Sequence, residues 1–181
     1  ASVYLSLIRP LTHPLLKHAV ETDLGPRYQQ QDADVVIFDR FWRPDVTCDK
    51  VEKAVDMARR GGAKIVYAVD DDLLNLPVRL TQVGSEVVRW PTENHREAMA
   101  FLLKEADSVW VTTAPLRDQY LFLNPNITVL PNCLDERLLV RPVPPADGFG
   151  NQQRVIGYMG TPTHDDDLAM VVPALREICD R

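Results

Sequence analysis

The stretch that decides the fold is Lys64–Val69, KIVYAV, which runs straight into Asp70, Asp71 and Asp72. After the lysine every residue is apolar, with no polar side chain at alternate positions. Such a continuous run is typical of a parallel strand that is covered on both faces. The stretch therefore predicts a strand in the middle of an α/β sheet, with three carboxylates at its carboxyl end.

Outward from this strand, apolar runs alternate with helical periodicity. Upstream, Val51, Ala54, Val55 and Ala58 fall on one face of a helix over residues 47–60, and a Gly-Gly pair ends it. Further strands are expected over residues 3–8, 35–38, 108–111 and 127–130, and further helices over residues 93–105, capped by Thr92, and from Thr112 or Thr113 to Leu121. Residues 73–91 are expected to be irregular. This alternation predicts a Rossmann-like parallel sheet with helices on both faces.

The composition of the chain disfavours several classes of protein. The chain has 181 residues, of which 45% are hydrophobic, so it can bury a core without disulfides or metals. A formal charge of −6 disfavours a sequence-independent nucleic-acid binder. No apolar run reaches the ~20 residues that a membrane-spanning helix needs. Peripheral contact with a membrane surface is compatible with the sequence. The cysteines Cys48, Cys133 and Cys179 fit neither a disulfide framework nor a zinc site, so we expect a cytoplasmic protein.

The chain is expected to divide near residue 140. Residues 1–140 form the first domain, and residues 141–153, RPVPPADGFGNQQ, are rich in proline and glycine and are typical of a linker. The alternation then restarts, with a strand over residues 155–159 and a helix from Asp165 that Pro173 kinks or divides. Residues 154–181 are either the first βα unit of a truncated second domain or an extra unit packed on the first sheet.

Ligands of open parallel sheets bind at the carboxyl ends of strands. Residues that bind a ligand are therefore expected where the predicted strands end. These places are Arg9-Pro10, Asp39-Arg40, Asp70 to Asp72, Thr112-Thr113, Pro131-Asn132 and the loop that starts at Gly160. Adjacent carboxylates such as Asp70, Asp71 and Asp72 repel one another unless they are solvated or neutralised. They suit a divalent metal ion or the hydroxyls of a sugar. The alternative is a solvated turn in which one aspartate caps the next helix.

The second candidate is the loop after residues 155–159, with Gly160, Thr161, Thr163 and His164. Small residues let a ligand approach the backbone, and a helix start attracts phosphate. The alternative is that the glycines are turn residues and that the acidic residues after His164 only complement the helix dipole. No P-loop, Gly-x-Gly-x-x-Gly or Ser-His-Asp arrangement stands out.

Three segments together resemble one branch of the GT-B glycosyltransferases, the group-1 or family-four type. They are YAVDDDL at residues 67–73, ADSVWVTT at 106–113 continuing through ITVLPNCLD at 127–135, and VIGYMGTPTH at 155–164 with Asp167-Leu168. The resemblance implies two Rossmann-like domains that face a cleft, with the acceptor on the N-terminal domain and the nucleotide-sugar donor on the C-terminal one. It also implies that no metal or other cofactor is needed.

By that resemblance, the loop from Gly160 to His164 faces the donor phosphates, and Asp70, Asp71 and Asp72 lie on the acceptor side. The family's paired glutamates belong to a later part of the second domain, beyond Arg181. We therefore expect an acceptor-side fragment, inactive alone, of an enzyme of polysaccharide biosynthesis that moves a sugar to a saccharide, lipid-linked or protein acceptor. Two alternatives remain: a non-catalytic α/β binding module, and a metal-dependent enzyme that uses the three aspartates.

Overall fold

The structure, a computed structural model, describes residues 4–16, 18–29, 32–83, 86–133, 156–158 and 165–179. The chain separates into two compact units, residues 1–135 and 136–181. The expected linker at residues 141–153 lies outside the described residues.

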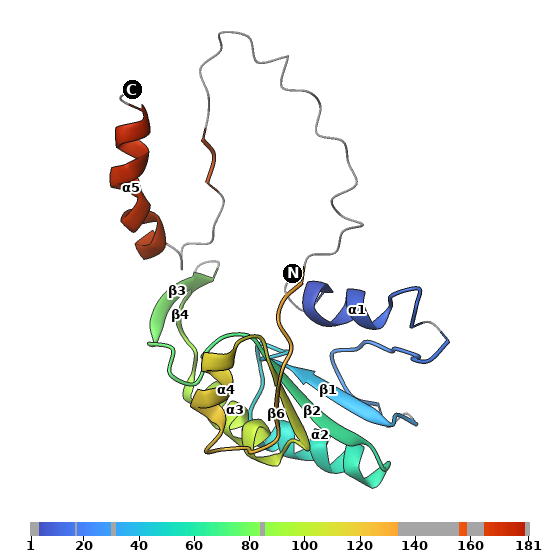
Figure 1. Cartoon of the computed structure of the whole chain (residues 1–181). Helices are drawn as coiled ribbons and strands as arrows, with labels where there is room; N and C mark the ends of the chain where they lie inside the picture. The colour runs from blue at the N-terminus through green and yellow to red at the C-terminus, as the bar shows by residue number, and fades with distance from the viewer. Residues whose placement is uncertain are drawn as a thin grey trace. The chain divides into compact units, whose positions relative to one another are not determined.

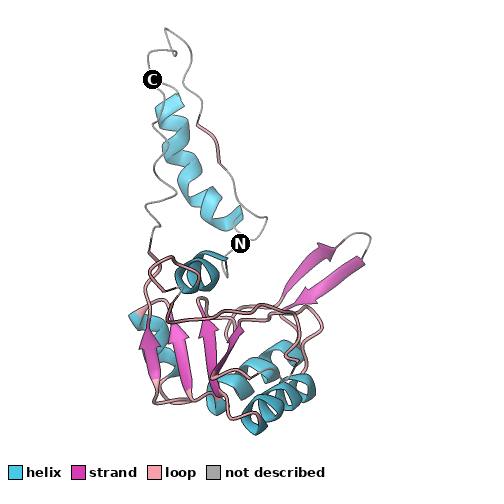
Figure 2. Cartoon of the chain, turned by 90° about the vertical axis from the view of Figure 1, so that its right-hand side faces the viewer, coloured by secondary structure: helices cyan, strands magenta, loops and turns pink. Residues whose placement is uncertain are grey.

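The first unit is built on a parallel sheet of four strands (Figures 1 and 2). The strands are β1 (Val35–Asp39), β2 (Lys64–Val69), β5 (Ser108–Val111) and β6 (Ile127–Val129), in the order β1-β2-β5-β6. Their registers align Val36 with Ile65, Val66 with Ser108 and Val109 with Ile127. The predicted α/β class and the strands predicted from residue 35 to residue 130 are confirmed, since the apolar runs do pair in parallel.

Three helices connect these strands and begin near the predicted caps. They are α2 (Cys48–Arg60), α3 (Glu93–Glu105) and α4 (Ala114–Tyr120). At α3 the Thr92 hydroxyl accepts from the N–H of His95, and the His95 ring in turn accepts from the N–H of Thr92. After α2, Gly62 adopts φ +86°, a left-handed conformation that favours glycine.

The core lies between these helices and one face of the sheet. The strands supply alternate side chains to it, namely Val36, Phe38, Ile65, Tyr67, Val69, Val109 and Val111. Each connecting helix leads to the next strand on the same side of the previous one. Since such crossovers are right-handed, the connecting helices lie on one face of the sheet. On the opposite face, Val66 and Ala68 of the central strand are also buried, whereas Ile37 and Trp110 are only half-buried. Ser6 and Leu7, near the N-terminus, approach the carboxyl end of that face.

Two predictions in the first unit are wrong. The strand expected over residues 3–8 is a π-helix, η1 (Tyr4–Ile8), continued by the short α1 (Arg9–Leu11), whereas Val3 lies outside the described residues. Strand propensity acts only when a neighbouring strand supplies hydrogen bonds, and within the described residues none pairs with this segment. Residues 73–91, expected to be irregular, contain an antiparallel hairpin of β3 (Arg79–Val83) and β4 (Glu86–Trp90) that projects from the sheet in Figure 2.

In the second unit, α5 (Asp165–Cys179) confirms the helix expected from Asp165. It runs through Pro173 without being divided, although proline removes one hydrogen bond of a helix interior. Ile156, Gly157 and Tyr158 form no strand and are exposed, so the strand expected over residues 155–159 is wrong at these three residues. The structure describes no strand beside them that could satisfy their backbone. Across the described residues of both units, every helix is too short or too polar to cross a membrane.

Candidate functional site

The carboxyl ends of the four strands bring polar residues to one edge of the sheet, at the arrowheads in Figure 2. Asp39 ends β1 and Arg40 follows it, and Asp70, Asp71 and Asp72 follow β2. Because β1 pairs with β2, Asp39 aligns with Ala68, two residues before Asp70. The sheet therefore places two acidic segments next to each other at its carboxyl edge, the edge at which open parallel sheets bind ligands.

Arg40 joins these two strand ends. Its N–H donates to the carbonyl of Ala68 at 2.9 Å and so continues the β1–β2 ladder by one bond. Its guanidinium donates to a carboxylate oxygen of Asp70 and lies 3.5 Å from Oδ2 of Asp71. The backbone of Arg40 has φ +42°, which non-glycine residues rarely adopt. A strained residue is held there by its surroundings, here by the ladder bond and the ion pair.

Asp70 is held by its backbone and by only part of its side chain. The Thr112 hydroxyl donates to the carbonyl of Asp70 at 3.3 Å, which links the ends of β2 and β5. One side-chain oxygen, Oδ2, accepts from Arg40. The other, Oδ1, is buried without a hydrogen-bond partner among the described residues, and so is Nε of Arg40. A buried acceptor without a donor is costly, and a bound molecule could supply that donor.

Asp72 has a different role. Its Oδ1 accepts from the Tyr120 hydroxyl at 2.8 Å and from the side-chain amide of Asn75 at 3.1 Å. Its Oδ2 accepts from the Gln119 amide at 2.6 Å. Asp72 therefore braces the loop after β2 against α4.

The three aspartates consequently diverge. Asp70 and Asp71 face Arg40, whereas Asp72 faces α4. In the described part of the chain, no three His, Cys, Asp or Glu side chains stand so that they could share a metal ion. The arrangement does not support the alternative of a metal-dependent enzyme. Arg40 neutralises Asp70 and Asp71 at the place where that hypothesis requires a metal ion.

Asp39 is the carboxyl group whose acidity the site changes most. Its pKa is raised from 3.8 to about 6, mainly by burial; Arg40 acts to lower it and the negative charge of Asp70 acts to raise it. A carboxyl group that titrates near neutral pH at a strand end is characteristic of functional sites. Asp39 can thus exchange a proton near neutral pH, and it is charged above its raised pKa.

A small hollow of about 70 Å³ opens at this edge. Its polar lining comes from Ser6, Asp39, Asp70, Thr112 and Asn132, and Trp110 and Leu130 are among its apolar neighbours. It holds a few water molecules or one functional group of a ligand. Convergence of several polar groups on one hollow is the usual mark of a binding site.

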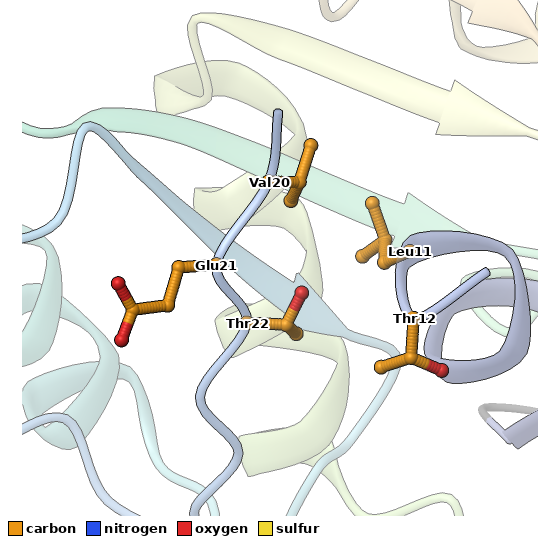
Figure 3. Close-up of a pocket in the computed structure, with 5 residues that line it drawn as sticks. All are labelled: Leu11, Thr12, Val20, Glu21 and Thr22. Atoms are coloured by element: carbon orange, nitrogen blue, oxygen red, sulfur yellow. The ribbon is translucent and has the colours of Figure 1, made fainter. Parts of the chain in front are cut away.

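A larger hollow, of about 360 Å³, lies between α1 and residues 20–22 (Figure 3). Leu11, Thr12, Val20, Glu21 and Thr22 line it. Figure 3 shows the Glu21 carboxylate pointing away from Leu11 and Thr12, so its charged group does not converge with the others. We therefore place the candidate site at the strand ends.

The structure describes only some of the site residues that the sequence predicts. Asp70 and Asp71 meet at Arg40, and Asp72 is turned toward α4. Gly160, Thr161, Thr163 and His164 lie outside the described residues, so their place beside a donor remains a prediction. Asp39 and Arg40 were among the strand ends but were not selected. A prediction that β1 pairs with β2 would have identified them, because this pairing places Asp39 and Arg40 beside Asp70.

Compared with known proteins, the chain matches no family model, no curated protein and no solved structure.

Proposed function

We propose that the first unit is the acceptor-side domain of a GT-B glycosyltransferase, which transfers a sugar from a nucleotide-sugar donor to a hydroxyl-bearing acceptor. The observation that carries the proposal is the hollow lined by the Asp39 and Asp70 carboxyl groups at the carboxyl edge of a Rossmann-like sheet. Sugar hydroxyls are hydrogen-bond donors, and carboxylates are strong acceptors for them. A cytoplasmic location and a role in polysaccharide biosynthesis belong to the same proposal.

The charges at the site favour a neutral, hydroxyl-rich ligand over a phosphate. Asp70 and Asp71 already share the guanidinium of Arg40. Asp39 adds a further acidic group on the same side. A phosphate placed here meets more negative than positive charge, whereas a hydroxyl can donate to the unpartnered Oδ1 of Asp70. This supports an acceptor saccharide at this edge and leaves the donor phosphates to another part of the enzyme.

The test is binding of neutral oligosaccharides to the 181-residue chain, followed by backbone amide shifts in NMR spectra. We expect shifts at Asp39, Asp70 and Thr112, and an affinity that falls about tenfold or more in Asp70→Asn, a loss of ~1.4 kcal/mol. Asp118→Asn is the matched control, since Asp118 is an exposed carboxylate whose partner is its neighbour Arg117.

Two outcomes would contradict the proposal. One is a panel of oligosaccharides that leaves the amides at the strand ends unshifted. The other is equal loss of affinity in Asp70→Asn and Asp118→Asn. By itself, the chain is expected to bind without transferring sugar, because catalysis needs groups positioned on both reactants. Turnover of a nucleotide sugar by the purified chain would show that this expectation is wrong.

A further inference from the structure

Among the described strands, β1 pairs with β2 alone. The N–H of Lys64 donates to the carbonyl of Asp34 at 2.8 Å, and the N–H of Arg40 donates to the carbonyl of Ala68 at 2.9 Å. Successive residues of a parallel strand direct their backbone groups to opposite sides. Ile37 and Asp39 therefore direct their N–H and C=O groups away from β2. Among the described residues, no strand accepts or donates along that edge.

Among the described residues, this edge lacks lysine, proline and a bulge, and its one charged residue is Asp39 at the carboxyl end. Natural edge strands are blunted by lysine, proline, bulges or a covering element. Here the sequence is Val-Val-Ile-Phe-Asp, with continuous pairing to β2 and no bulge. Val35 is 47% exposed, and Ile37 is half-buried. An apolar, regular edge of this kind is suited to receive another strand.

The segment Tyr4–Ile8 has the properties of that strand. Its sequence, YLSLI, is mostly apolar, and Pro10 ends the run. It forms a five-residue π-helix, a conformation that is rare and occurs mostly as a single turn inside longer helices. Ser6 and Leu7 line the hollow together with Asp39. The segment thus already lies at the carboxyl end of β1.

The connection between the two segments also has the required length and path. Residues 9–34 exceed the dozen or so residues that a parallel crossover needs. A strand added before β1 would extend the order β1-β2-β5-β6 in the same direction, so its right-handed crossover would lie on the face that α2 covers. Tyr28 and Ala33 pack against the core on that face, and the Tyr28 hydroxyl lies beside Gly61 at the end of α2.

We propose that Tyr4–Ile8 exchanges between the π-helix and a fifth parallel strand on the free edge of β1. In the strand state, its backbone pairs with Ile37 and Asp39. This change moves Ser6 and Leu7 away from three other residues that line the hollow. These are Trp110 in β5, Thr112 directly after β5, and Asn132 in the segment that follows β6. The exchange therefore opens the hollow toward solvent, and the N-terminal segment regulates access to it. This inference does not depend on what the hollow binds.

Amide hydrogen exchange of the whole chain, measured by NMR, tests the proposal. In the strand state the amides of Ile37 and Asp39 are protected, and Ser6→Val should slow their exchange about fivefold, because a β-branched residue favours strand by up to ~1 kcal/mol. Ser6→Pro should speed their exchange, since proline cannot donate to a strand partner. The Val66 amide, in the central strand β2, should stay unchanged and shows that each variant is folded.

Three outcomes would overturn the proposal. In the first, the Ile37 and Asp39 amides exchange at unprotected rates in both wild type and Ser6→Val. In the second, they are protected to the same degree in wild type, Ser6→Val and a chain that lacks residues 1–8. In the third, their protection rises with protein concentration, which would assign the edge to a second copy of the chain. If Ser6→Pro fails to fold, the comparison of wild type with Ser6→Val decides.

Discussion

Tyr120, the last residue of α4, donates its hydroxyl hydrogen to Oδ1 of Asp72 across 2.8 Å and thereby fixes the loop that follows β2. The Tyr120 side chain is fully buried. Burial raises the pKa of its phenol, and the hydrogen bond to Asp72 adds to this. The relationship separates Asp72 from its two neighbours, because Asp72 holds the fold whereas Asp70 and Asp71 hold Arg40.

Tyr120→Phe and Asp72→Asn should both destabilise the first unit. Each removes or weakens a buried hydrogen bond to a charged group, which lowers the free energy of unfolding by about 1–3 kcal/mol. Asp71→Asn is the control, since the Asp71 side chain is 60% exposed and its ion pair is long. Urea unfolding followed by circular dichroism measures the difference. Equal stability of Asp71→Asn and Asp72→Asn would show that the contacts to Asp72 are not stabilising.

Tyr67→Phe should have the opposite effect. The Tyr67 side chain is fully buried in β2, yet its hydroxyl has no hydrogen-bond partner among the described residues. Removing an unsatisfied buried hydroxyl relieves its desolvation penalty, so the variant should be as stable as wild type or more stable by about 1 kcal/mol. Thermal melts of Tyr67→Phe and Tyr120→Phe, run side by side, should therefore shift in opposite directions. A clear loss of stability in Tyr67→Phe would indicate a bound water or ligand on that hydroxyl.

Asp39→Asn should change how stability depends on pH. The pKa of Asp39 is about 6 in the folded chain against an ordinary value of 3.8, so the folded state holds the proton more tightly. Ionising Asp39 therefore costs stability, which falls as the pH rises from about 4 to 6 and stays lower above that range. Asparagine cannot ionise. Relative to wild type, the variant should gain on the order of 1–3 kcal/mol between pH 4 and pH 7, the value being reduced by partial solvation.

Urea titrations of wild type and Asp39→Asn at several pH values from 4 to 7 measure that gain. A stability difference that does not vary with pH over this range would mean that the Asp39 carboxyl has an ordinary acidity. Asp118→Asn serves as the reference here too, since an exposed carboxylate should show no such gain.

At Arg40, two substitutions distinguish the backbone contribution from the ion pair. Arg40→Ala and Arg40→Gly both leave the partly buried Asp70 carboxylate without its cation and should lower stability by about 2–4 kcal/mol. Only alanine retains the penalty of the left-handed backbone at φ +42°, so the glycine variant should be more stable than the alanine variant by about 1 kcal/mol. The reverse order in denaturant midpoints would show that the left-handed backbone is not strained.

Asn124 should be the most sensitive polar residue of the loop after α4. It is 4% exposed, and its amide donates to the carbonyls of Leu103 and Ala106, each at 2.9 Å. Asn124→Ala leaves both carbonyls without a donor and should cost about 2–4 kcal/mol. Asn126→Ala, which removes an exposed side-chain bond to the Asp107 carbonyl, should cost less than half of that in the same unfolding assay.

The strands of the sheet could be predicted because their apolar runs are buried by a sheet and helices close to them in the chain. Residues 3–8 show the limit of that argument, since an equally apolar run forms η1 and none of the described strands pairs with it. The β3–β4 hairpin was missed although two five-residue runs flank Gly84-Ser85, a spacing typical of a two-residue hairpin turn. Both errors concern pairing, which local composition does not specify.

At the candidate site, strand-end position directed attention to the aspartates after β2, but composition treated the three adjacent aspartates as one group. Their separation into Asp70, which meets Arg40, and Asp72, which meets Tyr120, depends on contacts between residues far apart in the chain. The register of β1 against β2 and the placing of α4 decide these contacts. Neither can be obtained from the spacing of the aspartates alone.

The order β1-β2-β5-β6 has a consequence for synthesis of the protein. Each strand of this sheet lies beside the previous one along the chain, so the growing polypeptide always adds to a single, most recent edge. No strand has to be inserted between two strands that are already paired. Such a sheet can assemble in the order in which the ribosome delivers it, without long-range loop closures waiting for distant segments. Helices α3 and α4 each pack on the strand of this sheet that precedes them, β2 and β5, so at those stages the newly emerged helix shields apolar residues of the strand just added from other nascent chains.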